Sequence, residues 1–263
     1  MKKIFTLIVL ILFSSFVFSQ DLEEKYSASQ SIISDIFVGK SILFGNIELS
    51  NKIINDHALA VLDTEELRLL RNSIYAKYGY TFSSPELTAF FSRFSWYKPS
   101  VKNVDEFLTD IDRHNIESIK LYENKYQNKP QIDSFDDLIK YDWNKDIVAA
   151  GRDADFFRFC DNGKIRFRNE EISLRLLYGY DGIYSIEDGI LKIEITELLI
   201  KFPNLDYDEN GFNGFDWGNH HVNKIKLEEP ILLRYPITGI EDFDFYGFSE
   251  KRIYIGTTPY YNR

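Results

Sequence analysis

The sequence predicts an α+β protein, in which a small domain of three helices precedes an antiparallel β domain built as a sandwich or a small barrel. Two observations predict this division. Between residues 63 and 126, apolar residues recur every three or four positions, after residues that can cap a helix. From residue 155 onward, short runs of alternating apolar and polar residues surround Asn-Gly and Asp-Gly pairs, which are strong hairpin signals.

The N-terminus has the layout of a secretory signal peptide. A basic head precedes an apolar run that starts at Ile4, and small or polar residues lead to a plausible cleavage point after Ser19. The run is short for a membrane-spanning helix. We therefore expect residues 1–19 to be removed, residues 20–48 to form a connector with a short helix, and the protein to be periplasmic or secreted, without stable membrane insertion. An uncleaved anchor is the alternative.

Charge and cysteine content narrow the class of partner. The chain carries a net charge of −10, and its first nineteen residues contribute two lysines and no acid, so the remainder stands at −12. An acidic surface repels phosphate backbones and anionic lipids, which argues against a nucleic-acid partner. The single cysteine, Cys160, excludes an intrachain disulfide framework. Stability must therefore come from packing, for which the 16% aromatic residues supply material.

The first predicted helix begins at a capping box formed by Asp63 and Glu66. Its end is predicted at Gly79, because glycine adopts the left-handed conformation that helix ends need. The apolar face between these points consists of Leu67, Leu70, Ile74 and Tyr78.

Two more helices are predicted by the same pattern of a capping residue followed by regularly spaced apolar residues. The second begins at Ser84 and Pro85, and Pro99 prevents its continuation. The third begins at a capping pattern, Thr109-Asp110-Ile111-Asp112. Their inward faces would be Leu87, Phe90 and Phe91 in the second helix and Ile111, Asn115, Ile119 and Tyr122 in the third. We expect the three helices to share one small core.

Residues 49–126 resemble the YARHG domain family, named for a Tyr-Ala-Arg-His-Gly signature. The signature reads Tyr-Ala-Lys-Tyr-Gly here, and Arg71-Asn72, Trp96-Tyr97 and Asn115-Ile116 fit the wider pattern. Lys77 keeps the charge of the family's arginine, whereas Tyr78 replaces its histidine. The resemblance implies an extracellular bacterial module that accompanies peptidase and kinase domains and has no known molecular function.

The tyrosine at position 78 favours a structural role for the signature. A general base or metal ligand at neutral pH could not be replaced by a phenol with a pKa near ~10. We expect Arg71 to bind Glu117 or Glu123, and Asn72 to bind a loop carbonyl, so that the first helix is tied to the third. The alternative is a ligand clamp, for which the candidate binding residues are Arg71, Asn72, Tyr75, Lys77, Trp96 and Tyr97.

Residues 127–154 are expected to form a linker with a short helix, and residues 155–263 the β domain. Hairpin turns are predicted at Asn162-Gly163 and Asp188-Gly189. The second hairpin is similar in pattern to lipocalin-type small barrels, a pattern that many antiparallel meanders share.

One stretch of the β domain has the residue types of a calcium loop. Asp206, Asp208 and Asn210 alternate before a glycine, as in the first half of such a loop. The second half departs from the pattern, because Trp217 occupies the position of the bidentate glutamate and Asp216 comes one place early. An acidic surface hairpin is the alternative, and no other cofactor is expected.

Catalytic motifs are absent from the sequence: it contains no nucleophile elbow, zinc-protease helix, phosphate-binding glycine loop or kinase signature. We therefore predict no catalytic residue and expect a non-enzymatic envelope or secreted binding module, whose partner is a protein or a cell-envelope component. The alternatives are a hydrolase with a carboxylate site in the β domain and a calcium-binding β domain.

Overall fold

A computed structural model of the chain describes residues 52–127, 129, 131–132, 135–145, 156–168, 177–208 and 211–262. Within these ranges, side chains are described except at residues 177–178 and 200–221. The predicted signal peptide and connector, residues 1–48, lie outside the described residues. No helix in the described part of the chain combines the length and the apolar character needed to cross a membrane.

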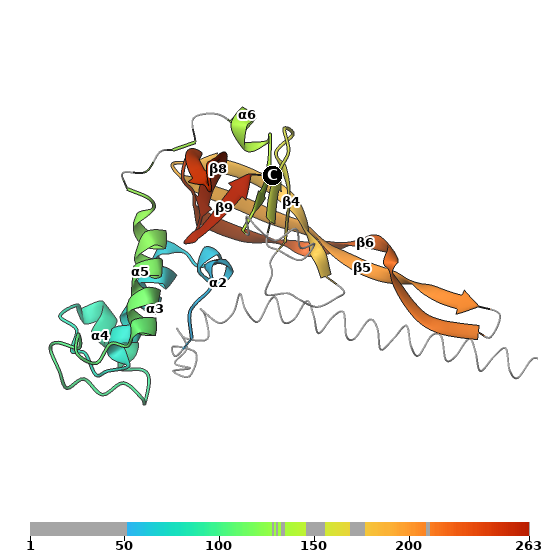
Figure 1. The fold of residues 1–263 in the computed structure, drawn as a ribbon. Helices are drawn as coiled ribbons and strands as arrows, with labels where there is room; N and C mark the ends of the chain where they lie inside the picture. Colours follow the sequence, from blue (N-terminus) through green and yellow to red (C-terminus); the bar gives the residue numbers. More distant parts are fainter. Residues whose placement is uncertain are drawn as a thin grey trace, which may run out of the picture.

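Three of the described helices form where the sequence predicts them, and a further short helix precedes them (Figure 1). The described residues contain α2 (Asp56–Ala60), α3 (Thr64–Ala76), α4 (Pro85–Phe91), α5 (Asp110–Asn124) and α6 (Phe135–Leu138). Both predicted capping boxes are present: Asp63 and Glu66 exchange bonds at the start of α3, and Thr109 and Asp112 do so at the start of α5. Three of these helices have seven or more residues, which agrees with an α+β protein, but a separate domain of three helices is not confirmed.

The remaining elements form one antiparallel sheet of nine strands in the order β6-β5-β4-β3-β2-β1-β9-β8-β7. The two predicted hairpins are confirmed, one joining β2 to β3 and the other joining β4 to β5 through Asp188 and Gly189, both at positive φ. The strands are β1 (Asp142–Asn144), β2 (Phe156–Phe159), β3 (Lys164–Arg168), β4 (Leu177–Glu187), β5 (Ile190–Asp208), β6 (Gly211–Pro236), β7 (Glu241–Phe245), β8 (Phe248–Ile255) and β9 (Thr258–Asn262).

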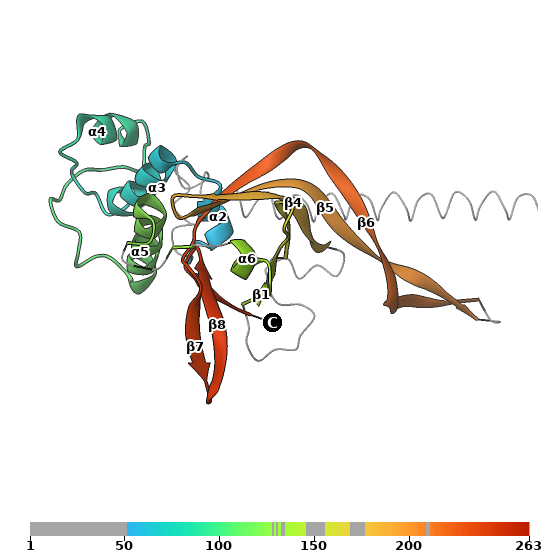
Figure 2. The same cartoon turned by 90° about the horizontal axis from the view of Figure 1, so that it is seen from above.

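The sheet is open, which corrects the expected sandwich or small barrel. Its edges are β6 and β7. Ile237, the residue after β6, forms an isolated bridge with Ile255 of β8. At this bridge, Gly256 N–H donates to Pro236 O over 2.9 Å. Strands β5 and β6, 19 and 26 residues long, continue past the other strands as a two-stranded arm (Figures 1 and 2). Alternation within a strand does not record such lengths or the strand order.

The spacing of the apolar residues suggested that the three helices share one small core. This prediction is wrong. Most buried hydrophobic side chains of α3 and α5, including Leu70, Ile74 and Ile119, belong to the same cluster as Trp143 and Phe157 of the sheet. A second, smaller cluster consists of Ala76, Phe82, Leu87, Phe91 and Tyr97. Only α4 and the loops around it therefore have a core of their own, and the predicted domain bounds remain predictions.

One carboxylate joins the helices to the sheet. Asp56, the first residue of α2, accepts hydrogen bonds at Oδ1 from the Tyr122 hydroxyl and the Thr257 N–H, both over 2.8 Å. At Oδ2 it accepts from the hydroxyls of Thr257 and Thr258, over 3.0 and 2.8 Å. Gly256 (φ +64°) leaves room for this contact, because a Cβ atom there would lie 2.3 Å from Asp56 Oδ1. The β8–β9 turn thus encloses the start of α2.

The neighbouring histidine is held neutral in the same junction. His57 Nδ1 lies 2.5 Å from the Tyr235 hydroxyl oxygen, and the two rings meet edge to face. Burial lowers the pKa of His57 from 6.5 to about 4; the Asp56 charge opposes this shift and Lys145 adds to it.

The depressed pKa of His57 predicts a loss of stability in acid. The contribution is complete above pH 6.5 and disappears as the pH falls towards 4, because the unfolded chain takes up the proton first. The loss is at most about 3 kcal/mol. Melting temperatures measured from pH 7 to pH 4 should fall less in a His57→Gln variant than in the wild type. A variant at the exposed His114, His114→Gln, should follow the wild type. Equal slopes for His57→Gln and the wild type would contradict this assignment.

Candidate functional site

The signature segment ends α3 as the sequence predicts. Tyr80 N–H donates to Tyr75 O over 3.3 Å and Gly79 N–H donates to Ala76 O over 2.9 Å, the bond pair of a Schellman motif. The Tyr75 and Tyr80 rings, 6.1 Å apart, supply the contact that usually accompanies this motif. Gly79 has φ +76°, and a Cβ atom there would lie 2.7 Å from Lys98 O. Conformation and close approach therefore both require glycine.

The next two signature side chains converge on a buried carboxylate of α5. Lys77 Nζ lies 2.9 Å from Asp112 Oδ1, and the Tyr78 hydroxyl donates to Asp112 Oδ2 over 2.6 Å. Thr109 adds its N–H and its hydroxyl, over 3.0 and 2.8 Å. The Asp112 side chain has no exposed surface. Burial alone would raise the pKa of Asp112, but the bonds from Tyr78, Lys77 and Thr109 outweigh it and lower the pKa.

This arrangement gives the signature a structural role. The carboxylate of Asp112 stays ionised, so its charge and that of Lys77 neutralise each other between α3 and α5. For the phenol of Tyr78, burial and the bond to Asp112 raise the pKa, so that the phenol remains a donor. The capping pattern identified Asp112 but not its partners from the signature. The sequence offered one signal of this contact: a lysine in the signature needs an acidic partner within reach.

Arg71 binds a predicted partner, whereas Asn72 binds an unexpected one. Arg71 makes two bonds to Glu123, of 2.7 and 3.1 Å, which confirms one of the two acids proposed for it. Asn72 instead donates to Arg68 O over 2.8 Å, within its own helix, so the predicted loop carbonyl is wrong. A short amide side chain reaches the carbonyl four residues earlier more easily than another element. A shallow groove of about 390 Å³ lies beside the Arg71–Glu123 pair.

The aromatic candidates lie in the smaller cluster. Tyr97 is buried and donates its hydroxyl to Tyr80 O over 2.8 Å. Trp96 packs on Phe91 and Phe94, and within the described residues its buried Nε1 has no hydrogen-bond partner. The structure thus brings Trp96 together with Tyr97, but not with the Lys77–Asp112 pair. Ligand binding by any of these residues remains a prediction.

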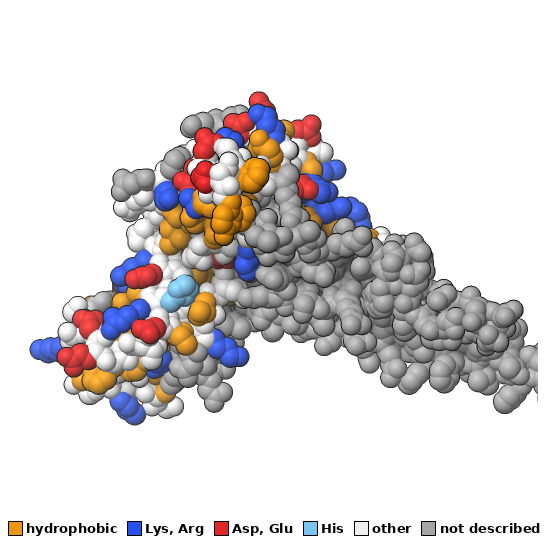
Figure 3. Space-filling model, in the orientation of Figure 1, with side chains coloured by type: hydrophobic (Ala, Val, Ile, Leu, Met, Phe, Trp, Pro, Cys, Tyr) orange, Lys and Arg blue, Asp and Glu red, His pale blue; other side chains and the backbone are white. Residues whose placement is uncertain are grey.

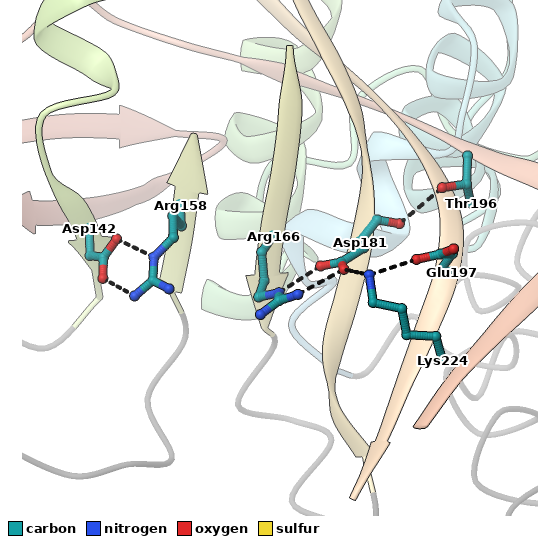
Figure 4. Close-up of polar contacts among 7 residues, drawn as sticks. All are labelled: Asp142, Arg158, Arg166, Asp181, Thr196, Glu197 and Lys224. Atoms are coloured by element: carbon teal, nitrogen blue, oxygen red, sulfur yellow. Dashed lines mark hydrogen bonds and ion pairs between the residues drawn. The ribbon is translucent and has the colours of Figure 1, made fainter. Parts of the chain in front are cut away.

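A row of charged side chains crosses the outer face of the sheet (Figure 4). Its members come from successive strands and form ion pairs with neighbours: Asp142 of β1 with Arg158 of β2, Arg166 of β3 with Asp181 of β4, and Lys224 of β6 with both Asp181 and Glu197 of β5. Arg158 and Arg166 are register partners, and so are Asp181 and Glu197. Opposite charges therefore offset the like charges that the register sets side by side.

The best-partnered acid of this row does not suit acid catalysis. Asp181 accepts two bonds from Arg166, of 2.7 and 2.9 Å, and one from Lys224, of 2.7 Å. Burial would raise the pKa of Asp181, but these bonds and charges lower it. A general acid needs the opposite shift. The hydrolase alternative therefore draws no support from Asp181, which instead clamps three strands.

The acidic stretch proposed for calcium forms the far end of the β5–β6 arm. Asp206 and Asp208 lie in β5 and Asp216 in β6, with Asp206 paired to Gly214 and Asp208 to Gly211. Their side chains, and the whole of Asn210, lie outside the described residues. The described side chains contain no group of three or more His, Cys, Asp or Glu residues that could hold a metal ion, and the side chains of this stretch are not among them. Calcium binding therefore stays a prediction.

Among the described residues, the most exposed large hydrophobic side chains occupy the β7–β8 hairpin. Tyr246 is 88% exposed and Phe248 69% exposed. Tyr246 (φ +51°) and Gly247 (φ +86°) form the two-residue turn between the strands. The hairpin extends away from the helices and from the rest of the sheet (Figure 2). In the space-filling view, hydrophobic side chains gather over the region of β8 and β9, with charged side chains around them (Figure 3).

Gly79 and Gly247 both have positive φ, so alanine substitutions at the two positions test why the end of α3 requires glycine. Gly79→Ala should destabilise the protein by about 2–3 kcal/mol, because it adds both an unfavourable φ and a clash with Lys98 O. Gly247→Ala should cost only about 1 kcal/mol, since nothing lies within 4 Å of the added atom. Urea unfolding of both variants gives the comparison. Equal losses would show that the close approach to Lys98 contributes nothing.

Removal of the Asp112 charge should weaken the link between α3 and α5. We expect Asp112→Asn to lower the free energy of unfolding by about 3 kcal/mol, because Lys77 is left without its counter-charge. Asp110→Asn, an exposed change in the same helical turn, should cost about 0.5 kcal/mol. Chemical denaturation measures both values, and an Asp112→Asn loss no larger than the control would contradict the role assigned to the pair.

The comparison with known proteins agrees with the signature. Residues 43–124 match the family model of the YARHG domain, and the C-terminal half has no family match. Neither the curated proteins nor the solved structures contain a match to this chain. The family match begins six residues before the predicted start and ends two residues before the predicted end. The chain thus carries a YARHG domain at residues 43–124, followed by an antiparallel sheet without a family match.

Proposed function

We propose that this protein is an exported, non-enzymatic binding protein of the bacterial envelope or of the secreted fraction. The signal-like N-terminus and the extracellular setting implied by the YARHG resemblance support the location. In this proposal α3 and α5 act as one helical unit, held by the Arg71–Glu123 and Lys77–Asp112 pairs. The β7–β8 hairpin makes the contact with a protein or with a cell-envelope component.

The exposure of Tyr246 and Phe248 carries the proposal. Aromatic side chains remove a large apolar area from water when a partner covers them, and they lose few rotatable bonds in doing so. Both flank the tip of one hairpin, with Phe245 in ring contact with Tyr246. A soluble protein that leaves two neighbouring rings in water has an apolar surface suited to a partner.

The contacts of the signature residues also favour the hairpin as the binding site. Lys77, Tyr78 and Arg71 already bind acids of α5. A ligand at the signature would have to displace these bonds, whereas a ligand at the hairpin would displace only water. The binding role is therefore assigned to the sheet, and the helices serve as its support.

Polar substitutions at the hairpin tip test this function. The double variant Tyr246→Ser/Phe248→Ser should lose most of the envelope proteins or fragments that the wild type retains from a bacterial envelope extract. Its melting temperature should stay within a few degrees of the wild type, because both side chains are exposed. The matched control Ile183→Ser/Ile225→Ser removes two exposed apolar side chains elsewhere on the sheet. Equal retention by both variants would contradict a role for the hairpin.

A further inference from the structure

Strand β7 offers an open edge for another strand. It is the last strand in the order of the sheet and, among the described residues, pairs only with β8. An unpaired edge presents main-chain N–H and C=O groups to any extended segment of matching chemistry. The same hairpin carries the exposed tip residues Tyr246 and Phe248.

The hairpin register decides which residues face outward. Phe245 pairs with Phe248 across the two-residue turn, and Phe243 pairs with Glu250. The pair that closes such a turn is a hydrogen-bonded pair, and bonded pairs alternate along an antiparallel ladder. The main-chain groups of Phe243 and Phe245 are thus directed towards β8. Those of Asp242 and Asp244 are directed towards the open edge.

The two faces of β7 differ in chemistry. Phe243 and Phe245 share one face, where the Arg252 guanidinium lies 4.6 Å from the centre of the Phe243 ring. Asp242 and Asp244 share the other face and are exposed. Lys251 bonds to Asp242, but the Asp242 side chain stays 74% exposed, and such surface pairs contribute only about 0–1 kcal/mol. The edge therefore keeps an acidic, alternating pattern.

This pattern disfavours a second copy of the chain. Two β7 strands paired antiparallel across a twofold axis would place the acids of one copy beside the acids of the other, which destabilises strand pairing. Acidic residues on an edge strand also oppose non-specific edge-to-edge association. A partner with opposite charges at alternate positions gains where a second copy loses.

We propose that the β7 edge binds an extended segment of a partner protein in which basic and apolar residues alternate, and that this segment adds to the sheet as a further strand. The proposal rests on the binding function assigned above and specifies the class of partner. Basic side chains of the segment lie beside Asp242 and Asp244, and apolar side chains lie beside Phe243. The outward N–H and C=O groups of the two aspartates supply the hydrogen bonds.

An end-blocked peptide of alternating lysine and valine, titrated into the purified protein, tests the proposal. Fluorescence anisotropy gives the affinity, and amide hydrogen exchange gives the mode of binding. Exchange at Asp242 and Asp244 should slow when the peptide binds, while exchange at Phe243, already directed towards β8, should change little. A peptide of the same composition with its lysines contiguous should bind about tenfold more weakly.

Variants separate charge from main-chain pairing. Asp242→Lys/Asp244→Lys should weaken binding by about tenfold or more, whereas Glu228→Lys/Glu229→Lys, the same charge change at exposed positions of β6, should alter it less than about twofold. Asp244→Pro removes an outward N–H, which an edge strand tolerates. It should therefore weaken binding more than Asp244→Asn does, and a thermal melt checks that the hairpin stays folded.

Equal affinity for the two peptides, or unchanged exchange at Asp242 and Asp244, overturns strand addition. The binding function itself stands if the envelope extract still yields a partner that depends on Tyr246 and Phe248 but not on Asp244→Pro. Both proposals fail if neither the peptide nor the extract distinguishes the wild type from these variants.

Discussion

The carboxylate of Asp56 fixes how the two halves of this protein meet. It accepts bonds from α5 through Tyr122 and from the β8–β9 turn through Thr257 and Thr258. These elements are separated by up to about two hundred residues, so the contact cannot arise from local chain preference. With α2 placed against this turn, the buried residues of α3 and α5 join those of the sheet in one cluster.

Three carboxylates, at different places in the structure, are held by several hydrogen-bond donors each. Asp56 is held by hydroxyls and an N–H, Asp112 by an ammonium and hydroxyls, and Asp181 by a guanidinium and an ammonium. Removal of a carboxylate from water is costly unless several donors replace the water. At Asp112 and Asp181 these donors lower the pKa of the carboxyl group, and each of the three acids joins elements far apart in the sequence. The contact of Lys77 and Tyr78 with Asp112 is one instance of this arrangement.

Local features of the fold were predictable from the sequence, and distant ones were not. The caps at Asp63 and Thr109, the stop at Gly79 and the turn at Asp188 each depend on a few neighbouring residues, whose chemistry leaves few alternatives. Arg71 could be assigned only to one of two acids. The strand order, the shared core and the acceptors of Lys77 and Tyr78 depend on pairings across the chain, which alternation does not encode. For the same reason, the position of β7 at an edge could not be foreseen.

The shared core has a consequence for how the helical module can be handled and how it can evolve. Leu70 and Ile119 have no exposed surface, and they belong to one cluster with buried residues of α2 and of the sheet. A fragment cut after residue 124 would lose the sheet residues of this cluster, and its newly exposed apolar surface would tend to aggregate or to recruit a substitute cover. Transfer of this signature between proteins therefore requires a compatible apolar lid, and the sheet in this chain plays that part.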